Sequence, residues 1–372
     1  MLLYNYNRPS LGAFILTIKF LVMKKIILSL LPVSVKKSIG RIKWKLKVRY
    51  GKYFIFIADS FGESFKDFML DNPVNILKKD LLNGVNDERS VDEINTIIKR
   101  HINYPDFSNK YPLKRGHSLV GGKLKCETDE EKNKIREATK TYKKTYKFNK
   151  NFFEESVFYY KHGLVFLDSK IKEYIKGYNI FDVGAHNGAS AIMFLNEFEP
   201  DKVISFEISD VSIDEYKKNL DFCSIPKSSY EIIKTGLTSD SKTGLLKFKD
   251  SGSPGLSVKS QEGVFEEGMS EVELKTLDQV VFERGFYPRV IKADIEGACF
   301  DMIKGAKETL LKFRPVLSLA IYHNPEEFYF VKPYLENLLP NYKFIFRKLT
   351  PNIMSNYIHS EVILIGYPEE II

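Results

Sequence analysis

The stretch that decides the fold reads NIFDVGAHNGASA, residues 179–191. It begins as a short apolar run and is interrupted by Gly184 and Gly188, with three residues between them, before an apolar pattern with helical spacing begins. This order predicts a strand, a tight turn and a helix. Glycine permits a sharp turn and the close approach of a ligand, so we expect a cofactor at this turn and Asp182 facing the same crevice. Taken alone, the two glycines fit a plain strand-to-helix turn equally well.

The residues after this turn repeat the alternation of strand and helix, which predicts a parallel sheet. The second strand, residues 202–206, ends at Glu207, 19 residues beyond the second glycine, where a carboxylate can accept both hydroxyls of a ribose. A third strand, residues 230–234, runs into Gly236 and Leu237, which could flank an adenine. Ligands of open α/β sheets bind at the carboxyl ends of the strands, so we expect the site at this edge.

Six segments occur in an order that resembles the FkbM family of S-adenosylmethionine-dependent methyltransferases: FDVGAHNGASA, SFEIS, TGLTSD, LKTLDQVV, IKADIEGACFDMIKGAKETL and PVLSLAIYHNPEEF. The fifth segment, residues 291–310, is the most specific, and the resemblance extends over residues 153–367. It implies an α/β, Rossmann-like methyltransferase fold with a mostly parallel seven-stranded sheet that ends in an antiparallel pair. Two positions depart from the family pattern: Ala189 stands where an acidic residue is usual, and Ile208 where a proline is usual.

The resemblance also implies that the cofactor is S-adenosyl-L-methionine. We expect its contacts to come from the glycine turn, from the end of the second strand and from the turn after the third strand. These candidate cofactor-binding residues are Asp182, Gly184, Ala185, His186, Asn187, Gly188, Glu207, Gly236 and Leu237.

Methyl transfer from a sulfonium to a hydroxyl is an in-line displacement, so the protein must hold the two groups together and remove a proton. Candidates for this base are Asp294, Glu296 and His323, which follow the expected fourth and fifth strands. We favour His323 because its ordinary pKa of about 6.5 lies close to neutral pH, and we expect Asp294 to orient the acceptor. Each also has a structural alternative: a helix cap for Asp294, a surface role for Glu296 and a buried strand-end role for His323.

A divalent cation is the alternative to a protein base. Asp294 together with His323 and Asn324 could hold magnesium, because carboxylate and amide oxygens are its usual ligands. Strand-end acids are common without a metal, so we assign none from the sequence.

The net charge of +8 has its origin in the N-terminal arm. Residues 1–58 contain twelve Lys or Arg and no acid, which leaves 44 basic against 48 acidic residues in the remainder. A mildly acidic body argues against a nucleic-acid groove. Residues 33–52 interleave cations with Trp44 and aliphatic residues, which suits the surface of an anionic membrane or a flexible basic arm. The apolar stretch before them is interrupted by lysines and is too short to span a bilayer, and Met23 is a second candidate start.

We divide the chain into a basic arm (residues 1–52), a mainly helical region (53–150) and a methyltransferase domain (151–372). The three cysteines lack disulfide or zinc spacing, which favours a location in the cytoplasm. If the arm binds a membrane, we expect it at the inner face of the cell membrane. The function we expect is O-methylation of a sugar hydroxyl in glycan or surface polysaccharide biosynthesis. The alternatives are a small secondary metabolite or peptide as acceptor, or an inactive cofactor-binding module. A nicotinamide-dependent oxidoreductase is disfavoured because the turn lacks the G-x-G-x-x-G pattern.

Overall fold

The computed structural model describes residues 54–55, 62–102, 113–114, 122–146, 153–250, 252, 269–351 and 361–371. The arm, with its expected membrane segment at residues 33–52, lies outside these ranges. The chain divides into two compact units, residues 1–56 with 112–117, and residues 57–111 with 118–372. In the first unit β1 (Phe54–Ile55) pairs antiparallel with β2 (Leu113–Lys114). The second unit holds the sheet and the helices described below.

The described part of the second unit contains a seven-stranded sheet in the order β11-β12-β10-β9-β3-β4-β5. Strands β5, β4, β3, β9 and β10 are parallel, and β12 runs antiparallel between β10 and β11. The bounds are β3 Asn179–Val183, β4 Val203–Glu207, β5 Tyr230–Lys234, β9 Pro288–Ala293, β10 Val316–Ala320, β11 Tyr342–Lys348 and β12 Val362–Pro368. The expected fold class, with its terminal antiparallel pair, is confirmed.

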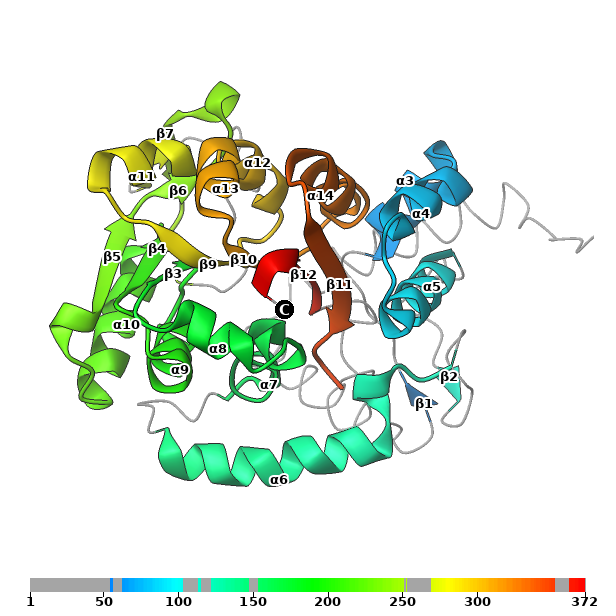
Figure 1. Cartoon of the computed structure of the whole chain (residues 1–372), viewed down its shortest axis with the longest axis horizontal. Coiled ribbons are helices and arrows are strands. Elements are labelled where there is room, and N and C mark those ends of the chain that lie inside the picture. Colours follow the sequence, from blue (N-terminus) through cyan, green and yellow to red (C-terminus); the bar gives the residue numbers. More distant parts are fainter. Residues whose placement is uncertain are drawn as a thin grey trace, which may run out of the picture. The chain divides into compact units, whose positions relative to one another are not determined.

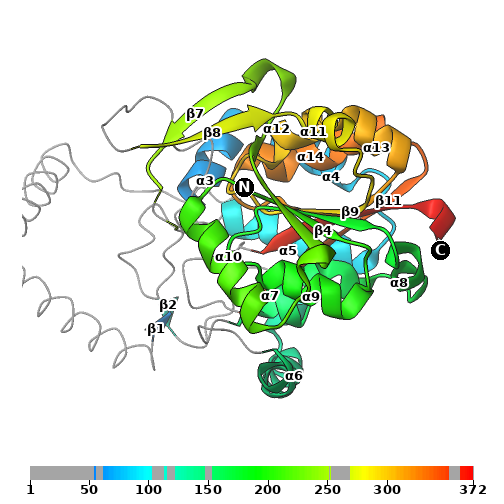
Figure 2. The ribbon, with the colours of Figure 1, turned by 90° about the vertical axis from the view of Figure 1, so that its left-hand side faces the viewer.

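Helices cover both faces of this sheet, which explains why its central strands are almost entirely buried. Figures 1 and 2 show α8, α9 and α10 on one face and α11 to α14 on the other. The bounds are α7 Glu155–Phe158, α8 Lys170–Ile175, α9 Ala189–Phe198, α10 Asp210–Phe222, α11 Leu277–Arg284, α12 Cys299–Lys304, α13 Lys307–Phe313 and α14 Pro325–Leu338. With both faces covered, the carboxyl edge of the strands is the part of the sheet that a ligand can reach.

A smaller sheet extends the fold beyond β5. Strand β6 (Gly236–Leu237) pairs parallel with β8 (Ser270–Lys275), and β7 (Gly244–Phe248) pairs antiparallel with β8. The side chains of Ile208, Phe248, Val272 and Leu274 form its own small core.

The helical region before the methyltransferase domain consists of α3 (Gly62–Asp71), α4 (Val74–Leu82), α5 (Glu88–Ile102) and α6 (Asp129–Thr145). Helices α3 and α4 pack against α14, and α5 packs against β11. Strand β11 is the edge of the large sheet, so its outward N–H groups lack strand partners. The Ser90 hydroxyl accepts the N–H of Phe346 (2.8 Å), and the Glu93 carboxylate accepts that of Lys348 (2.7 Å). Helix α5 therefore closes the edge of the sheet.

Among the described residues, no helix combines the length and the apolar character that crossing a membrane requires.

Candidate active site

The turn after β3 is shaped by the strand beside it. Gly184 has φ +79°, and a Cβ on it would lie 1.9 Å from the carbonyl oxygen of Asp294. Any side chain at this position would therefore collide with the end of β9. Gly188 also has a positive φ, +81°, but its missing Cβ makes room for Leu220 and Tyr216 of α10, 2.7 and 3.0 Å away. The structure thus corrects the reason for Gly188: it allows two helices to pack closely.

Asp182 lies beneath the turn and does not face the crevice. It is fully buried, and its Oδ1 lies 3.0 Å from Nζ of Lys292, which is also buried. The ammonium of Lys292 donates to the carbonyl of Gly184 as well (2.9 Å). Burial lowers the pKa of Lys292, but the carboxylates of Asp182 and Asp294 more than offset this and raise it. The pair therefore holds the turn from below, and the expected direct contact of Asp182 with the cofactor stays a prediction.

Glu207 stands at the end of β4 with its carboxylate fixed by backbone donors. One oxygen accepts the N–H of His186 (2.8 Å), and the other accepts those of Ile208 (2.8 Å) and Ser209 (3.0 Å). The side chain is half-buried, so part of the carboxylate is open to a ligand. This geometry joins the glycine turn to the strand end that the sequence assigned to the ribose.

The remaining cofactor candidates take three different positions. Ala185 is buried within the turn, and Asn187 directs its carbonyl oxygen Oδ1 to the N–H of Ala189 (3.1 Å), at the start of α9. Gly236 and Leu237 are buried as strand β6. Their proximity to an adenine stays a prediction.

The three catalytic candidates meet at the carboxyl edge because β9 and β10 are parallel neighbours. Nε2 of His323 lies 3.3 Å from Oδ1 of Asp294 and 3.5 Å from Oε2 of Glu296. The His323 side chain is 3% exposed, whereas those of Asp294 and Glu296 are 28% and 26% exposed. A buried imidazole thus points at two carboxylates that solvent and a ligand can reach.

Two groups around this cluster were missed by the sequence interpretation. Glu327, fully buried in α14, places Oε2 3.6 Å from Nδ1 of His323. It follows the histidine by four residues, a helical spacing that could have indicated the contact. Glu361, at the start of β12, accepts the Tyr322 hydroxyl (3.2 Å), and no local pattern predicted it.

Burial and mutual repulsion set the protonation of this region. Burial raises the pKa of Glu296 to about 7, with a further contribution from the charge of Asp294. The pKa of Glu361 is also raised to about 7, by burial and then by Asp294. Burial would lower the pKa of His323, but Glu327, Asp294 and Glu296 raise it to about 9. The upward shift of its pKa weakens the pKa argument for His323 as the base, and its catalytic role stays a prediction.

Asn324, expected as a metal ligand, has another role. Its Oδ1 accepts the N–H of Glu327 (2.9 Å) and so caps α14, while its Nδ2 donates to the carbonyl of Gly297 (3.0 Å). The amide thus fixes the start of α14 against the turn at Gly297, and its binding of a cation stays a prediction.

Three residues around the site hold left-handed backbone conformations that favour glycine: His186 (φ 42°), Glu296 (φ 51°) and Glu361 (φ 58°). Such conformations cost on the order of 1–3 kcal/mol each and concentrate at functional sites.

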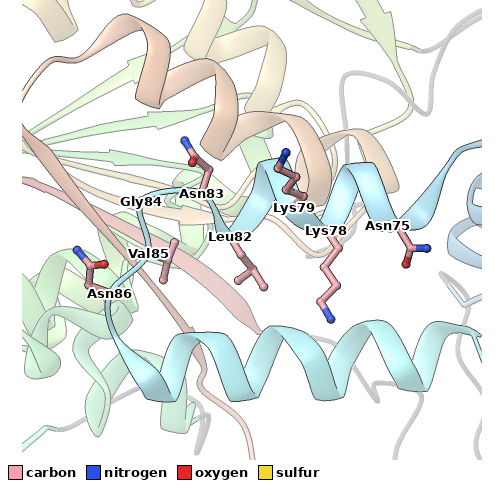
Figure 3. Close-up of a pocket in the computed structure, with 8 residues that line it drawn as sticks. All are labelled: Asn75, Lys78, Lys79, Leu82, Asn83, Gly84, Val85 and Asn86. Atoms are coloured by element: carbon pink, nitrogen blue, oxygen red, sulfur yellow. The ribbon is translucent and has the colours of Figure 1, made fainter.

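A separate pocket lies beside the end of α4 and the turn after it (Figure 3). Its lining includes Lys78, Lys79 and Asn83 but no acid or histidine. It therefore lacks the groups needed to accept a proton, and we place the chemistry at the sheet edge.

The fold and the sheet-edge site define a class, the Rossmann-like methyltransferases. Within that class, residues 182–346 match the family model described as the Methyltransferase FkbM domain. Residues 182–346 are therefore similar to the FkbM methyltransferase domain, and the expected resemblance is confirmed.

One solved structure supports the fold. The methyltransferase FkbM from Methylobacillus flagellatus aligns with a TM-score of 0.51 at 15% identity, covering 82% of this chain and 61% of that one. The chain thus spans less than two thirds of that protein. An rRNA methylase from Streptococcus thermophilus (TM-score 0.34, 13% identity, 56% of this chain and 93% of that one) is more distant. A precorrin-6y C5,15-methyltransferase from Geobacter metallireducens is also more distant. Its TM-score is 0.32 at 12% identity, covering 53% of this chain and 84% of that one. No curated protein matches the sequence.

Proposed function

We propose that this protein transfers a methyl group from S-adenosyl-L-methionine to a hydroxyl of a sugar, in a glycan or surface polysaccharide. The observation that carries the proposal is the convergence of Asp294, Glu296 and His323 at the sheet edge that also holds the glycine turn. A methyl acceptor placed there meets groups able to orient a hydroxyl and to receive its proton.

The residues fit the cofactor in two respects. The half-buried Glu207 carboxylate is fixed by three backbone N–H groups and retains capacity to accept the ribose hydroxyls. The turn from Gly184 to Gly188 places its main chain at the same edge of the sheet as Glu207. Bound there, the cofactor supplies an electrophilic methyl on a sulfonium.

The transfer requires little else of the protein. The acceptor oxygen attacks the methyl carbon, an O–C bond forms, the S–C bond breaks, and sulfur keeps the electron pair. The hydroxyl proton passes to the group formed by Asp294, Glu296 and His323. The protein's contribution is then mainly to hold the reactants in line and to take this proton.

The experiment that tests the function is transfer of label from methyl-labelled S-adenosylmethionine to a panel of glycans. Labelled sugar is the expected result. Label found on a small metabolite or a peptide would favour the alternative acceptors, and cofactor binding without transfer to any acceptor would favour an inactive module.

Replacing Glu207 tests the cofactor site. We expect Glu207→Gln to weaken S-adenosylmethionine binding by ten- to a hundredfold, since hydrogen bonds to a charged group are worth about 1.5–3 kcal/mol. Calorimetric titration measures the change. Glu199→Gln is the matched control, because Glu199 is an exposed surface carboxylate beyond α9 that pairs with Lys176. Equal affinity in both variants would remove Glu207 from the cofactor site.

Replacing His323 tests the catalytic cluster. We expect His323→Ala to reduce turnover by roughly a hundredfold or more, because the two carboxylates lose the group that faces both of them. Cofactor affinity should change little, since His323 follows β10, whereas the glycine turn and Glu207 lie at the ends of β3 and β4. The prediction fails if turnover is retained, or if kcat is unchanged and only the binding of S-adenosylmethionine weakens.

A further inference from the structure

We propose that Asp294, Glu296 and His323 form a binding site for one divalent cation of the Mg²⁺ or Mn²⁺ class. The role of this cation in catalysis rests on the proposed function, but its binding does not.

The distances within the cluster suit a cation. Each of the three residues offers one ligand atom, and these atoms lie within 4.8 Å of one another. Two ligands at right angles on a cation with bonds of about 2.1 Å lie about 3 Å apart. The separations from His323 Nε2 to the two carboxylates, 3.3 and 3.5 Å, need to shrink by only a few tenths of an ångström (about 0.3–0.5 Å against that spacing). The ligands stand at the ends of neighbouring strands, so this arrangement is largely built in advance.

A second observation also points to a ligand at this place. Oδ1 of Asp294 is buried, and among the described residues it accepts no hydrogen bond of ordinary geometry. An ionised oxygen buried in this way is costly unless a donor or a cation satisfies it. The same oxygen faces Nε2 of His323 at 3.3 Å, so a cation between the two would bind both.

The far side of the histidine completes the arrangement. Glu327 is fully buried and faces Nδ1 of His323 at 3.6 Å, so Nδ1 is directed to a carboxylate and Nε2 to the cluster. Histidine ligands of metal sites regularly have such a carboxylate behind them, because it fixes the ring and its tautomer. The fully buried Glu327 is anchored in turn by the N–H of Cys299 (2.7 Å).

The ligand chemistry limits the choice of cation. Two carboxylate oxygens and one imidazole, without a thiolate, favour a hard or borderline cation over one that selects sulfur. Three protein ligands on an octahedral cation leave positions for water and for the acceptor hydroxyl. The bond changes in the transfer stay as described above. Only the destination of the hydroxyl proton changes, from the protein group to water.

The test is titration of the untagged full-length chain with Mn²⁺ alone, followed by paramagnetic resonance of the free ion and by calorimetry, with no cofactor or acceptor present. We expect one Mn²⁺ per chain in the wild type, at least tenfold weaker binding in Glu296→Gln and His323→Gln, and ten- to a hundredfold weaker binding in Glu327→Gln. Thermal unfolding of each variant shows whether it is folded.

Glu207→Gln is the matched control, because it alters the cofactor site at the same edge and leaves the three ligands in place. It should retain Mn²⁺ while losing S-adenosylmethionine affinity. A wild-type chain that binds Mn²⁺ but no S-adenosylmethionine would uphold the cation site and reject the proposed function. No bound Mn²⁺ in the wild type, or equal binding in folded Glu296→Gln and His323→Gln, would overturn the cation site.

Discussion

Gly184→Ala is expected to destabilise the protein by about 2–5 kcal/mol, as the sum of two costs. A left-handed backbone costs a residue with a Cβ about 1–2 kcal/mol, and forcing atoms into a filled site typically costs about 1–3 kcal/mol more. The second cost is large here because the new Cβ would lie 1.9 Å from the backbone oxygen of Asp294, which cannot swing aside as a side chain can. The midpoint of urea unfolding measures the loss.

Gly177→Ala separates the two costs. Gly177 has nearly the same backbone conformation, φ +74°, but nothing lies within 4 Å of the position that its Cβ would take. It should therefore lose only the conformational cost, about 1–2 kcal/mol. Equal losses in the two variants would show that β9 does not constrain the turn as the structure describes.

Arg100→Met is expected to cost about 3–5 kcal/mol, because it removes the hydrogen-bonded cationic partner of the buried Glu127 carboxylate, whose other cationic neighbour, Nζ of Lys348, lies 4.0 Å away. The guanidinium donates to both oxygens of Glu127, at 2.7 and 2.8 Å, and the side chains of this pair are 2% and 0% exposed. Burial raises the pKa of Glu127, but the hydrogen bonds and charge of Arg100 outweigh it and lower that pKa. Urea unfolding monitored by circular dichroism checks the loss.

The double variant Arg100→Met with Glu127→Gln is the control for this prediction. It removes both charges, while the amide oxygen can still accept the N–H of Leu124, which the carboxylate accepts at 2.9 Å. Most of the lost stability should return. A double variant as unstable as Arg100→Met alone would show that lost packing, rather than the unpaired charge, is responsible.

Much of the fold and the positions of the site followed from local patterns. The strand, turn and helix of residues 179–191 and the apolar strands after them are periodic features that any reader of the sequence can count. Asp294, Glu296 and His323 could be placed together because parallel strands end at one edge of a sheet. That rule gives the neighbourhood of these residues, but not their contacts or their protonation.

The sequence by itself therefore determined the fold class, the glycine turn after the first strand of the sheet and the edge at which the three candidate catalytic residues lie, because each depends on residues close together in the chain. Tertiary structure alone decided what those residues touch. Asp182 forms an ion pair with Lys292, 110 positions away. The edge of β11 is closed by α5, more than 240 positions before it. Contacts across such separations leave no period in the sequence, since each is chosen by packing and by the need to satisfy buried polar groups.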